Sequence, residues 1–449
     1  MPKIDYIKRL ITKDKPIDSE NKLGFWPATA LIIGNMIGSG IFLLPASLAL
    51  YGGISMIGWV LSSLGAVAMA IIFGSLGRRL PNLTGGPYAY TRAKLGDFPA
   101  FLVAWGYWIS VWCAVAAIAV AFVGYLSIFI PVLSTNNTLA VGTGLVVIWG
   151  FTWINSRPLK TVGTVQLITT ILKITPLLVV GVVGIFFIKP QHFSNFNLST
   201  ETNLSAIVST TTLTFYAFLG VESVAIIGKN IKDPKKNIKR TTVTGTIITL
   251  IVYLLGSTAV MGILSPETLS QSSAPFADAA QVFLGNTAKY VIAIGAMVAT
   301  LGALNGWILL QGQMPLSAFK DKLFPTFFGK VNKHESPILG VVISSILASI
   351  VMISNYTGSL AKAFTFMMML STLSTVIPFL FSCTSYGILL KGEKQNLWPR
   401  IGMLAFIIAF LLLVIAGSGK EVVFYGFILL MCGVPFYIFQ KNQNGDSNL

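Results

Sequence analysis

Long runs of apolar residues, separated by short polar stretches, follow one another along almost the whole chain. Each run has at least about 18 residues, enough for a helix to cross a hydrocarbon core of roughly 30 Å. Because backbone groups in lipid must find hydrogen-bond partners within their own segment, the runs predict an all-α polytopic membrane protein of about twelve transmembrane helices. The spans are expected near residues 25–48, 54–77, 98–130, 138–155, 162–188, 204–228, 241–264, 287–315, 337–355, 363–390, 400–417 and 421–440.

Polar segments flank these spans at both ends of the chain. Residues 1–24 are expected to form a cytoplasmic N-terminal segment, because they carry charges of both signs and lack the short apolar core of a removable signal peptide. Residues 25–440 are expected to form one transmembrane domain, and residues 441–449 a cytoplasmic tail.

Composition and charge agree with a lipid environment. Of the 449 residues, 54% are hydrophobic and only 10% are charged, far below the share of roughly 25% in soluble domains. The net charge of +16 comes from Lys and Arg in alternate loops, and only Lys189, Lys289, Lys362 and Lys420 fall on the side opposite the N-terminus. This bias predicts an inner (plasma) membrane protein with both termini cytoplasmic, and it makes nucleic acid a poor partner.

The residues that catalysis or ATP binding would need are missing. The nearest match to GxxxxGK[ST], Gly417 to Lys420, lacks the upstream glycine and is followed by Glu421. His192 and His334 fall in predicted loops, and the three cysteines contain no CxxC pair, so we expect neither a metal site nor a cofactor. We therefore expect a protein that is not an enzyme and that draws its energy from solute or ion gradients.

Glycines interrupt two of the predicted spans. Gly34, Gly38 and Gly40 lie in the first, and each lowers helix propensity by roughly 1 kcal/mol relative to alanine. The second interruption, Thr214 to Ser223, lies five spans later. Breaks at corresponding positions of two five-helix halves are typical of inverted-repeat transporters, whose site lies at mid-membrane. The alternative interpretation is that these glycines only allow close helix packing.

An unwound stretch in a helix exposes backbone groups that can bind a zwitterion. The amides of Ser39 and Gly40, at the start of the next half-helix, could hold a carboxylate. The carbonyls of Met36, Tyr216 and Leu219 could accept hydrogen bonds from an α-ammonium group.

Two ionisable residues fall inside predicted spans, where a charge is costly and points to function. Glu222 could accept a proton or act as a gate beside a cationic substrate, or it could hold the broken helix by a structural hydrogen bond. Lys173, three residues before the helix-kinking Pro176, could titrate near neutral pH in place of a coupling cation, or it could stay charged and bond to carbonyls of the first span. The sequence leaves both pairs of alternatives open.

Aromatic residues in the spans could line a pocket for an aliphatic or cationic side chain. Taken singly, each is better explained as packing or as an interfacial anchor. Trp307, in the middle of its span, is the strongest candidate. The set comprises Tyr107, Trp108, Trp112, Tyr216 and Trp307.

The segments Gly34 to Pro45, Gly85 to Tyr90 and Phe218 to Ser223 resemble those of the amino acid/polyamine/organocation transporters. The chain is most similar to their basic amino acid/polyamine antiporter branch, the arginine/agmatine and putrescine/ornithine exchangers. The resemblance implies the leucine-transporter fold, two five-helix inverted repeats (about 25–190 and 204–390) with broken helices 1 and 6, followed by two extra helices (about 400–440). It also implies a homodimer.

The resemblance also implies roles for residues of this chain. Gly38, Ser39 and Gly40 match the carboxylate-binding segment, Trp307 the guanidinium-stacking tryptophan, and Ser371 a polar group near the substrate tail. The expected substrate-binding residues are Met36, Ile37, Gly38, Ser39, Gly40, Tyr107, Val115, Ile118, Tyr216, Leu219, Trp307 and Ser371. The expected gating or proton-coupling residues are Glu222, Lys173, Trp112 and Phe379.

Four positions depart from the arginine exchangers. Val115 stands where they have asparagine, Tyr216 where they have tryptophan, and Phe379 where they have a gate tyrosine; Lys173 is instead similar to proton-coupled or neutral amino acid members of the superfamily. The function predicted is exchange of a cationic amino acid (arginine, ornithine or lysine) for an amine such as agmatine or putrescine by alternating access. The alternative is proton-coupled uptake of neutral amino acids. Two other classes fit less well. A non-transporting sensor would need a soluble output domain, and a channel would need a charged ring or filter; neither is found in the sequence.

Overall fold

The computed structural model describes most of the chain. The described residues are 23–81, 83, 85–157, 173–226, 228, 231–332, 336–355, 360–390 and 397–445. Outside them lie most of the expected N-terminal segment, the first part of the expected span 162–188, His334 and the end of the expected tail.

Helices account for nearly all of the described structure. In the first half they are α2 (Phe25–Met36), α3 (Ser39–Ala49), η2 (Gly52–Ile54), α4 (Ser55–Arg79), α5 (Pro87–Leu95), α6 (Asp97–Leu126), α7 (Val132–Thr135), α8 (Asn137–Asn155), η3 (Val179–Val183), η4 (Ile185–Phe187) and η5 (Pro190–Phe193). In the second half they are α10 (Asn203–Phe215), η6 (Tyr216–Phe218), α11 (Ser223–Ile226), α12 (Pro234–Ile263), α13 (Pro266–Gln271), α14 (Pro275–Lys320), η8 (Thr326–Gly329), α15 (Ile338–Asn355), α16 (Leu360–Leu390), α17 (Leu397–Gly417), α18 (Lys420–Met431) and α19 (Gly433–Gly445).

The all-α polytopic architecture expected from the apolar runs is confirmed. Among the described residues, 9 helices are long and apolar enough to cross a membrane, and two shorter apolar helices lie at Lys173–Phe187 and Ile338–Ser354. The expected span 204–228 is the broken series α10, η6 and α11. The expected span 287–315 is the larger part of α14, which bends at Gly285, where φ is 79°.

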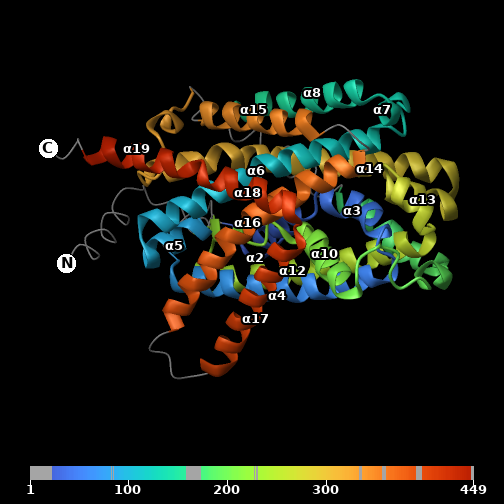
Figure 1. The fold of residues 1–449 in the computed structure, drawn as a ribbon, viewed down its shortest axis with the longest axis horizontal. Coiled ribbons are helices and arrows are strands. Elements are labelled where there is room, and N and C mark those ends of the chain that lie inside the picture. Colours follow the sequence, from blue (N-terminus) through green and yellow to red (C-terminus); the bar gives the residue numbers. More distant parts are fainter. Residues whose placement is uncertain are drawn as a thin grey trace.

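Helix α6 lies at the centre of the bundle. Almost all of its residues from Ala100 to Tyr125 are buried, and it contacts α5, α8, α14, α15 and α16. In Figure 1, α8 and α15 run side by side along one edge of the bundle, while α4 and α17 lie toward the opposite edge. Helix α4 packs against α10, α12 and α17. The two broken segments therefore lie inside a cage of longer helices.

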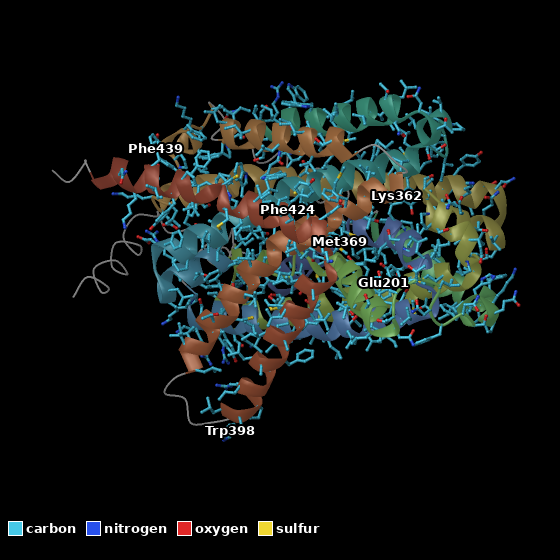
Figure 2. The ribbon with its side chains drawn as sticks, in the orientation of Figure 1. Glu201, Lys362, Met369, Trp398, Phe424 and Phe439 are labelled. Atoms are coloured by element: carbon cyan, nitrogen blue, oxygen red, sulfur yellow. The ribbon has the colours of Figure 1, made fainter. Side chains whose placement is uncertain are left out.

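Large apolar side chains cover the outside of the bundle. Trp398 on α17, Phe424 on α18 and Phe439 on α19 are 81%, 61% and 58% exposed, and Figure 2 shows Trp398 and Phe439 toward the edges of the view. An aqueous surface would not carry so many exposed aromatic and aliphatic side chains. These faces are suited to contact with lipid tails.

An arginine ties two helices together outside the spans. The Arg92 guanidinium of α5 pairs through Nε with Asp97 at 2.7 Å and through Nη1 with Asp321, just after α14, at 3.0 Å. Burial raises the pKa of the Asp321 carboxyl, and Arg92 and Tyr88 oppose that shift without cancelling it. Ionising Asp321 therefore costs more in the folded protein than in the unfolded chain.

Replacing Asp321 with asparagine is expected to leave the protein at least as heat-stable as the wild type at neutral pH, within about 1 kcal/mol. Because the folded-state pKa is raised, the wild type gains stability relative to the variant as the pH falls through that pKa. The melting temperatures of the wild type and of Asp321→Asn, measured at neutral and at mildly acidic pH, should therefore be closer to each other at the acidic pH. The control is Asp97→Asn, which changes the more exposed partner of Arg92. If Asp321→Asn is less stable than the wild type at neutral pH, the ion pair outweighs the cost of burying the carboxylate.

Candidate functional site

The first break separates α2 from α3 in the buried interior. Ile37 is extended (φ −72°, ψ 96°), and Gly38 (φ −137°, ψ −145°) precedes α3 without a side chain that could cap it. The first N–H groups of α3, from Ser39 onward, have no partner within the helix. Met36 to Gly40 are all buried. A desolvated helix start with open amides favours an anion.

The second break lies between η6 and α11. Gly220 has φ 106°, a conformation that side-chain-bearing residues rarely adopt, and a Cβ there would lie 3.1 Å from the carbonyl carbon of Asn35. The Asn35 side-chain amide donates to Ser223 Oγ (2.9 Å), and Ser223 Oγ donates to the Gly220 carbonyl (2.5 Å). The two breaks are thus joined by hydrogen bonds as well as by packing.

A second contact joins the breaks on the α3 side. A Cβ built on Gly40 would lie 3.1 Å from Tyr216 Cδ1 and 3.3 Å from Ala217 Cα. The hydroxyls of Ser39 and Tyr216 are 3.4 Å apart. Only glycine at position 40 lets the start of α3 approach η6 this closely without displacing it.

The three carbonyls expected to bind an ammonium group differ in their partners. The Met36 carbonyl accepts from Tyr253 OH (2.5 Å), and the Tyr216 carbonyl accepts from the Leu219 amide (3.1 Å). In the part of the chain that the structure describes, no donor bonds the Leu219 carbonyl. Because a carbonyl has two lone pairs, Met36 and Tyr216 would share theirs with a ligand, whereas Leu219 would not.

Glu222 connects the second break to α6. Its side chain is completely buried; Oε1 accepts from Tyr107 OH (2.7 Å) and Oε2 from the Gly220 amide (3.1 Å). These two hydrogen bonds support the interpretation that Glu222 holds the broken helix in place. A carboxylate suits this place because both neighbours can donate to it.

Lys173 reaches the first span. It is completely buried, and its ammonium group donates to the Gly34 carbonyl of α2, close to the break. This contact is the hydrogen bond that one of the two alternatives for Lys173 requires, a lysine bonded to a carbonyl of the first span. Any change in its protonation would be felt at the end of α2.

The remaining expected residues lie in the buried bundle at different distances from the breaks. Gly38 faces Ala303, one turn of α14 before Trp307. Trp112, Val115 and Ile118 are buried in α6, and the Trp112 indole N–H has no hydrogen-bond partner within the described residues.

Three expected polar or aromatic groups are turned toward the scaffold. Ser371 Oγ donates to the Ser110 carbonyl (2.8 Å), so its hydroxyl links α16 to α6. Trp108 Nε1 donates to Ser344 on α15 (2.7 Å). Phe379 packs edge-on against Phe215, the residue before Tyr216, with ring centroids 6.3 Å apart. Phe379 thus contacts the end of α10, just before the second break.

Three residues at the breaks were missed by the sequence analysis. Asn35, Ser223 and Tyr253 make the hydrogen bonds that connect the breaks to each other and to α12. Asn35 and Ser223 could have been found, because both are polar residues inside glycine-interrupted spans. Tyr253 could not, because one tyrosine in an apolar span gives no sign of its partner.

Comparison with known proteins settles the family. The sequence profile of the amino acid permeases matches residues 23–448, almost the entire chain. The chain belongs to the amino acid permease family. The predicted resemblance to the amino acid/polyamine/organocation superfamily is therefore confirmed, and this permease is a multi-pass membrane protein.

Three relatives indicate a branch of the superfamily to which the permease is similar. It is 30% identical to the cadaverine/lysine antiporter of Escherichia coli (strain K12), over 94% of this chain and 95% of the relative. It is 29% identical to the arginine/ornithine antiporter of Pseudomonas aeruginosa (strain PAO1), over 84% and 81%. It is 28% identical to the putrescine transporter PotE of Haemophilus influenzae, over 93% and 97%. The relatives are transporters of the basic amino acid/polyamine antiporter branch.

Proposed function

We propose that this permease exchanges a cationic amino acid of the arginine, ornithine or lysine type for a related amine, such as agmatine or putrescine, by alternating access. The observation that carries the proposal is the meeting of the two breaks at Gly40 and Tyr216, beside the open amides of α3 and the buried Glu222. The names of the relatives support the choice of substrate class.

The proposed binding mode assigns each end of the substrate to a different part of the site. The α-carboxylate lies on the amides of Ser39 and Gly40, where the helix dipole favours a negative charge. The α-ammonium group donates to the Leu219 carbonyl, with Met36 sharing its second lone pair. The cationic side chain of the substrate extends toward Trp307. The carboxylate of Glu222, at the second break, supplies the negative charge that favours this cation. Agmatine and putrescine, which lack the carboxylate, depend on this second half of the site.

We propose further that both termini are cytoplasmic in a bacterial plasma membrane, because Lys and Arg concentrate in the loops on that side. The permease would act without catalysis, ATP or nucleic acid, and a homodimer is its proposed assembly.

The second candidate function is proton-coupled uptake of neutral amino acids. It is favoured by the contact of Lys173 with Gly34, which could pass a change in lysine charge to the first break.

Counterflow in proteoliposomes tests the proposal. Vesicles are loaded with unlabelled arginine, ornithine, lysine, agmatine, putrescine or a neutral amino acid, and entry of labelled arginine is followed at several pH values. Entry only when a cationic species is trapped inside is the expected result. Entry of a labelled neutral amino acid driven by an inward proton gradient, with nothing trapped, would overturn exchange and establish the second candidate, and Lys173→Met should then abolish that uptake.

A further inference from the structure

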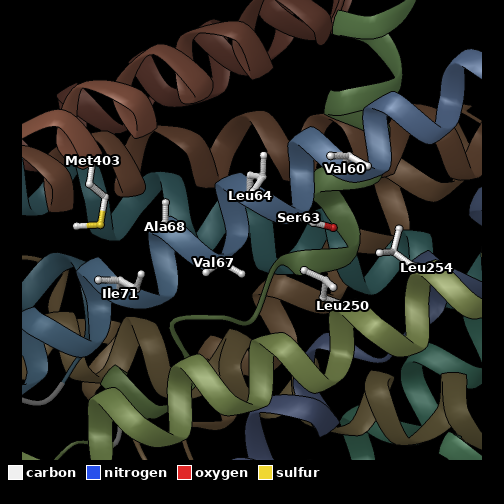
Figure 3. Close-up of a pocket in the computed structure, with 9 residues that line it drawn as sticks. All are labelled: Val60, Ser63, Leu64, Val67, Ala68, Ile71, Leu250, Leu254 and Met403. Carbon is white, nitrogen blue, oxygen red and sulfur yellow. The ribbon is translucent and has the colours of Figure 1, made fainter. Parts of the chain in front are cut away.

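A groove of about 290 Å³ lies on the outer face of the bundle, between three helices. Figure 3 shows α4 along one wall and α12 along the other, with Met403 of α17 near one end. Val60 and Leu64 are 51% and 53% exposed, so the groove faces the lipid. Its lining is apolar except for one hydroxyl: Val60, Ser63, Leu64, Val67, Ala68, Ile71, Leu250, Leu254 and Met403.

The shape of the groove follows from small residues on α4. At Gly74, a Cβ would lie 2.7 Å from the Lys239 Cα, so α12 touches the α4 backbone there. At Gly65, α17 approaches still more closely, so that the ring of Phe410 would overlap the position of a Cβ. These glycines let α12 and α17 pack tightly against α4, and the small side chain of Ala68 lies in the lining of the groove beside them.

A basic cluster, Arg78, Lys239 and Arg400, lies at one end of the same three helices. Arg78 stands at the end of α4, and Lys239 and Arg400 stand near the starts of α12 and α17. Lys239 lies within electrostatic range of both arginines. The like charges of Arg78 and Lys239 repel one another, and an anion placed beside them would relieve that repulsion.

The groove leads toward the basic cluster. Ile71, at the groove's end, is two turns or about 10 Å along α4 from Arg78, and Met403 is one turn from Arg400 on α17. From Val60 to Ile71 the groove runs for about 16 Å, close to half of a hydrocarbon core of roughly 30 Å. An acyl chain that starts at the basic cluster therefore enters the groove and ends within it.

We propose that the groove and the basic cluster form a binding site for one anionic phospholipid of the surrounding membrane. An acyl chain occupies the groove along α4, and the phosphate lies among Arg78, Lys239 and Arg400. A second copy of the permease fits less well. A two-fold dimer across this face would bring the two basic clusters together on the same side of the membrane, where like charges oppose association.

Lipid binding to the purified full-length permease, measured by native mass spectrometry, tests the proposal. The probes are dioleoylphosphatidylglycerol and dioleoylphosphatidylcholine. The wild type is expected to prefer the anionic lipid, and Arg78→Gln/Lys239→Gln should lower the affinity for it by roughly 30-fold. The charge-matched control is Lys94→Gln/Lys441→Gln, on α5 and α19, which should leave that affinity unchanged.

Filling the groove gives a second, independent measurement. Val67→Trp should displace the acyl chain and lower binding of the anionic lipid, whereas Val146→Trp, at a 73% exposed position on α8, should not. Leu64→Trp, at an exposed edge of the groove, repeats the test if Val67→Trp does not fold. Equal affinity of the wild type for both lipids, or a preference that survives the loss of Arg78 and Lys239, would overturn the proposal. So would a wild-type dimer that Val67→Trp separates into monomers.

Discussion

Gly40→Val is expected to reduce arginine counterflow to background. The added Cβ would lie 3.1 Å from the Tyr216 ring and 3.3 Å from the Ala217 backbone, which is already tighter than ordinary van der Waals contact, and valine adds two further methyl groups to that Cβ. Overpacking of this kind costs about 1–3 kcal/mol, and here the strain falls on the amides proposed to hold the substrate carboxylate. Binding should fail before folding does.

A graded series separates loss of the site from loss of the fold. Gly40→Ala adds only the Cβ and should weaken arginine binding less than Gly40→Val. Gly150→Val on α8 is the matched control, because nothing lies within 4 Å of a Cβ at that position. Thermal stability and monodispersity are measured for all three variants. If Gly40→Val is well folded and retains wild-type affinity for arginine, the amides of Ser39 and Gly40 do not hold the carboxylate.

Much of the architecture could be predicted because lipid imposes it. Every described span follows an apolar run, since a helix must satisfy its own backbone in the bilayer. The bend of α14 at Gly285 was harder to foresee, because one glycine among several in apolar segments does not announce a positive φ.

The breaks could be located from the sequence, but their partners could not. Three glycines in seven residues identify the end of α2, and Gly220 identifies the second break. The bonds from Tyr253 to Met36 and from Lys173 to Gly34 join residues 217 and 139 positions apart. No local pattern encodes such pairs, because they depend on how α12 and the segment at Lys173 pack against α2.

Glu222→Gln is expected to lower the maximal exchange rate by roughly tenfold or more, with a smaller change in the apparent affinity for arginine. The carboxylate accepts hydrogen bonds from Tyr107 on α6 and from the Gly220 amide, so it links the scaffold to the second break. A glutamine presents one acceptor and one donor, so its oxygen can keep the Gly220 amide only if the Tyr107 hydroxyl turns from donor to acceptor. The negative charge is lost as well, and the charge-assisted hydrogen bonds become weaker neutral ones. We expect alternating access to open and re-form this link in each cycle, so the exchange rate should fall more than the affinity for arginine.

Charge and hydrogen bonding at Glu222 can be separated by comparing variants. Tyr107→Phe removes one donor and keeps the negative charge, so it should slow exchange less than Glu222→Gln. Glu201→Gln, in the loop before α10, is the control that should leave exchange unchanged. If protonation of Glu222 sets the rate, the wild type varies with pH while Glu222→Gln does not. A wild-type rate that is constant across pH removes the proton from the mechanism and leaves Glu222 as a fixed charge that holds the break to α6.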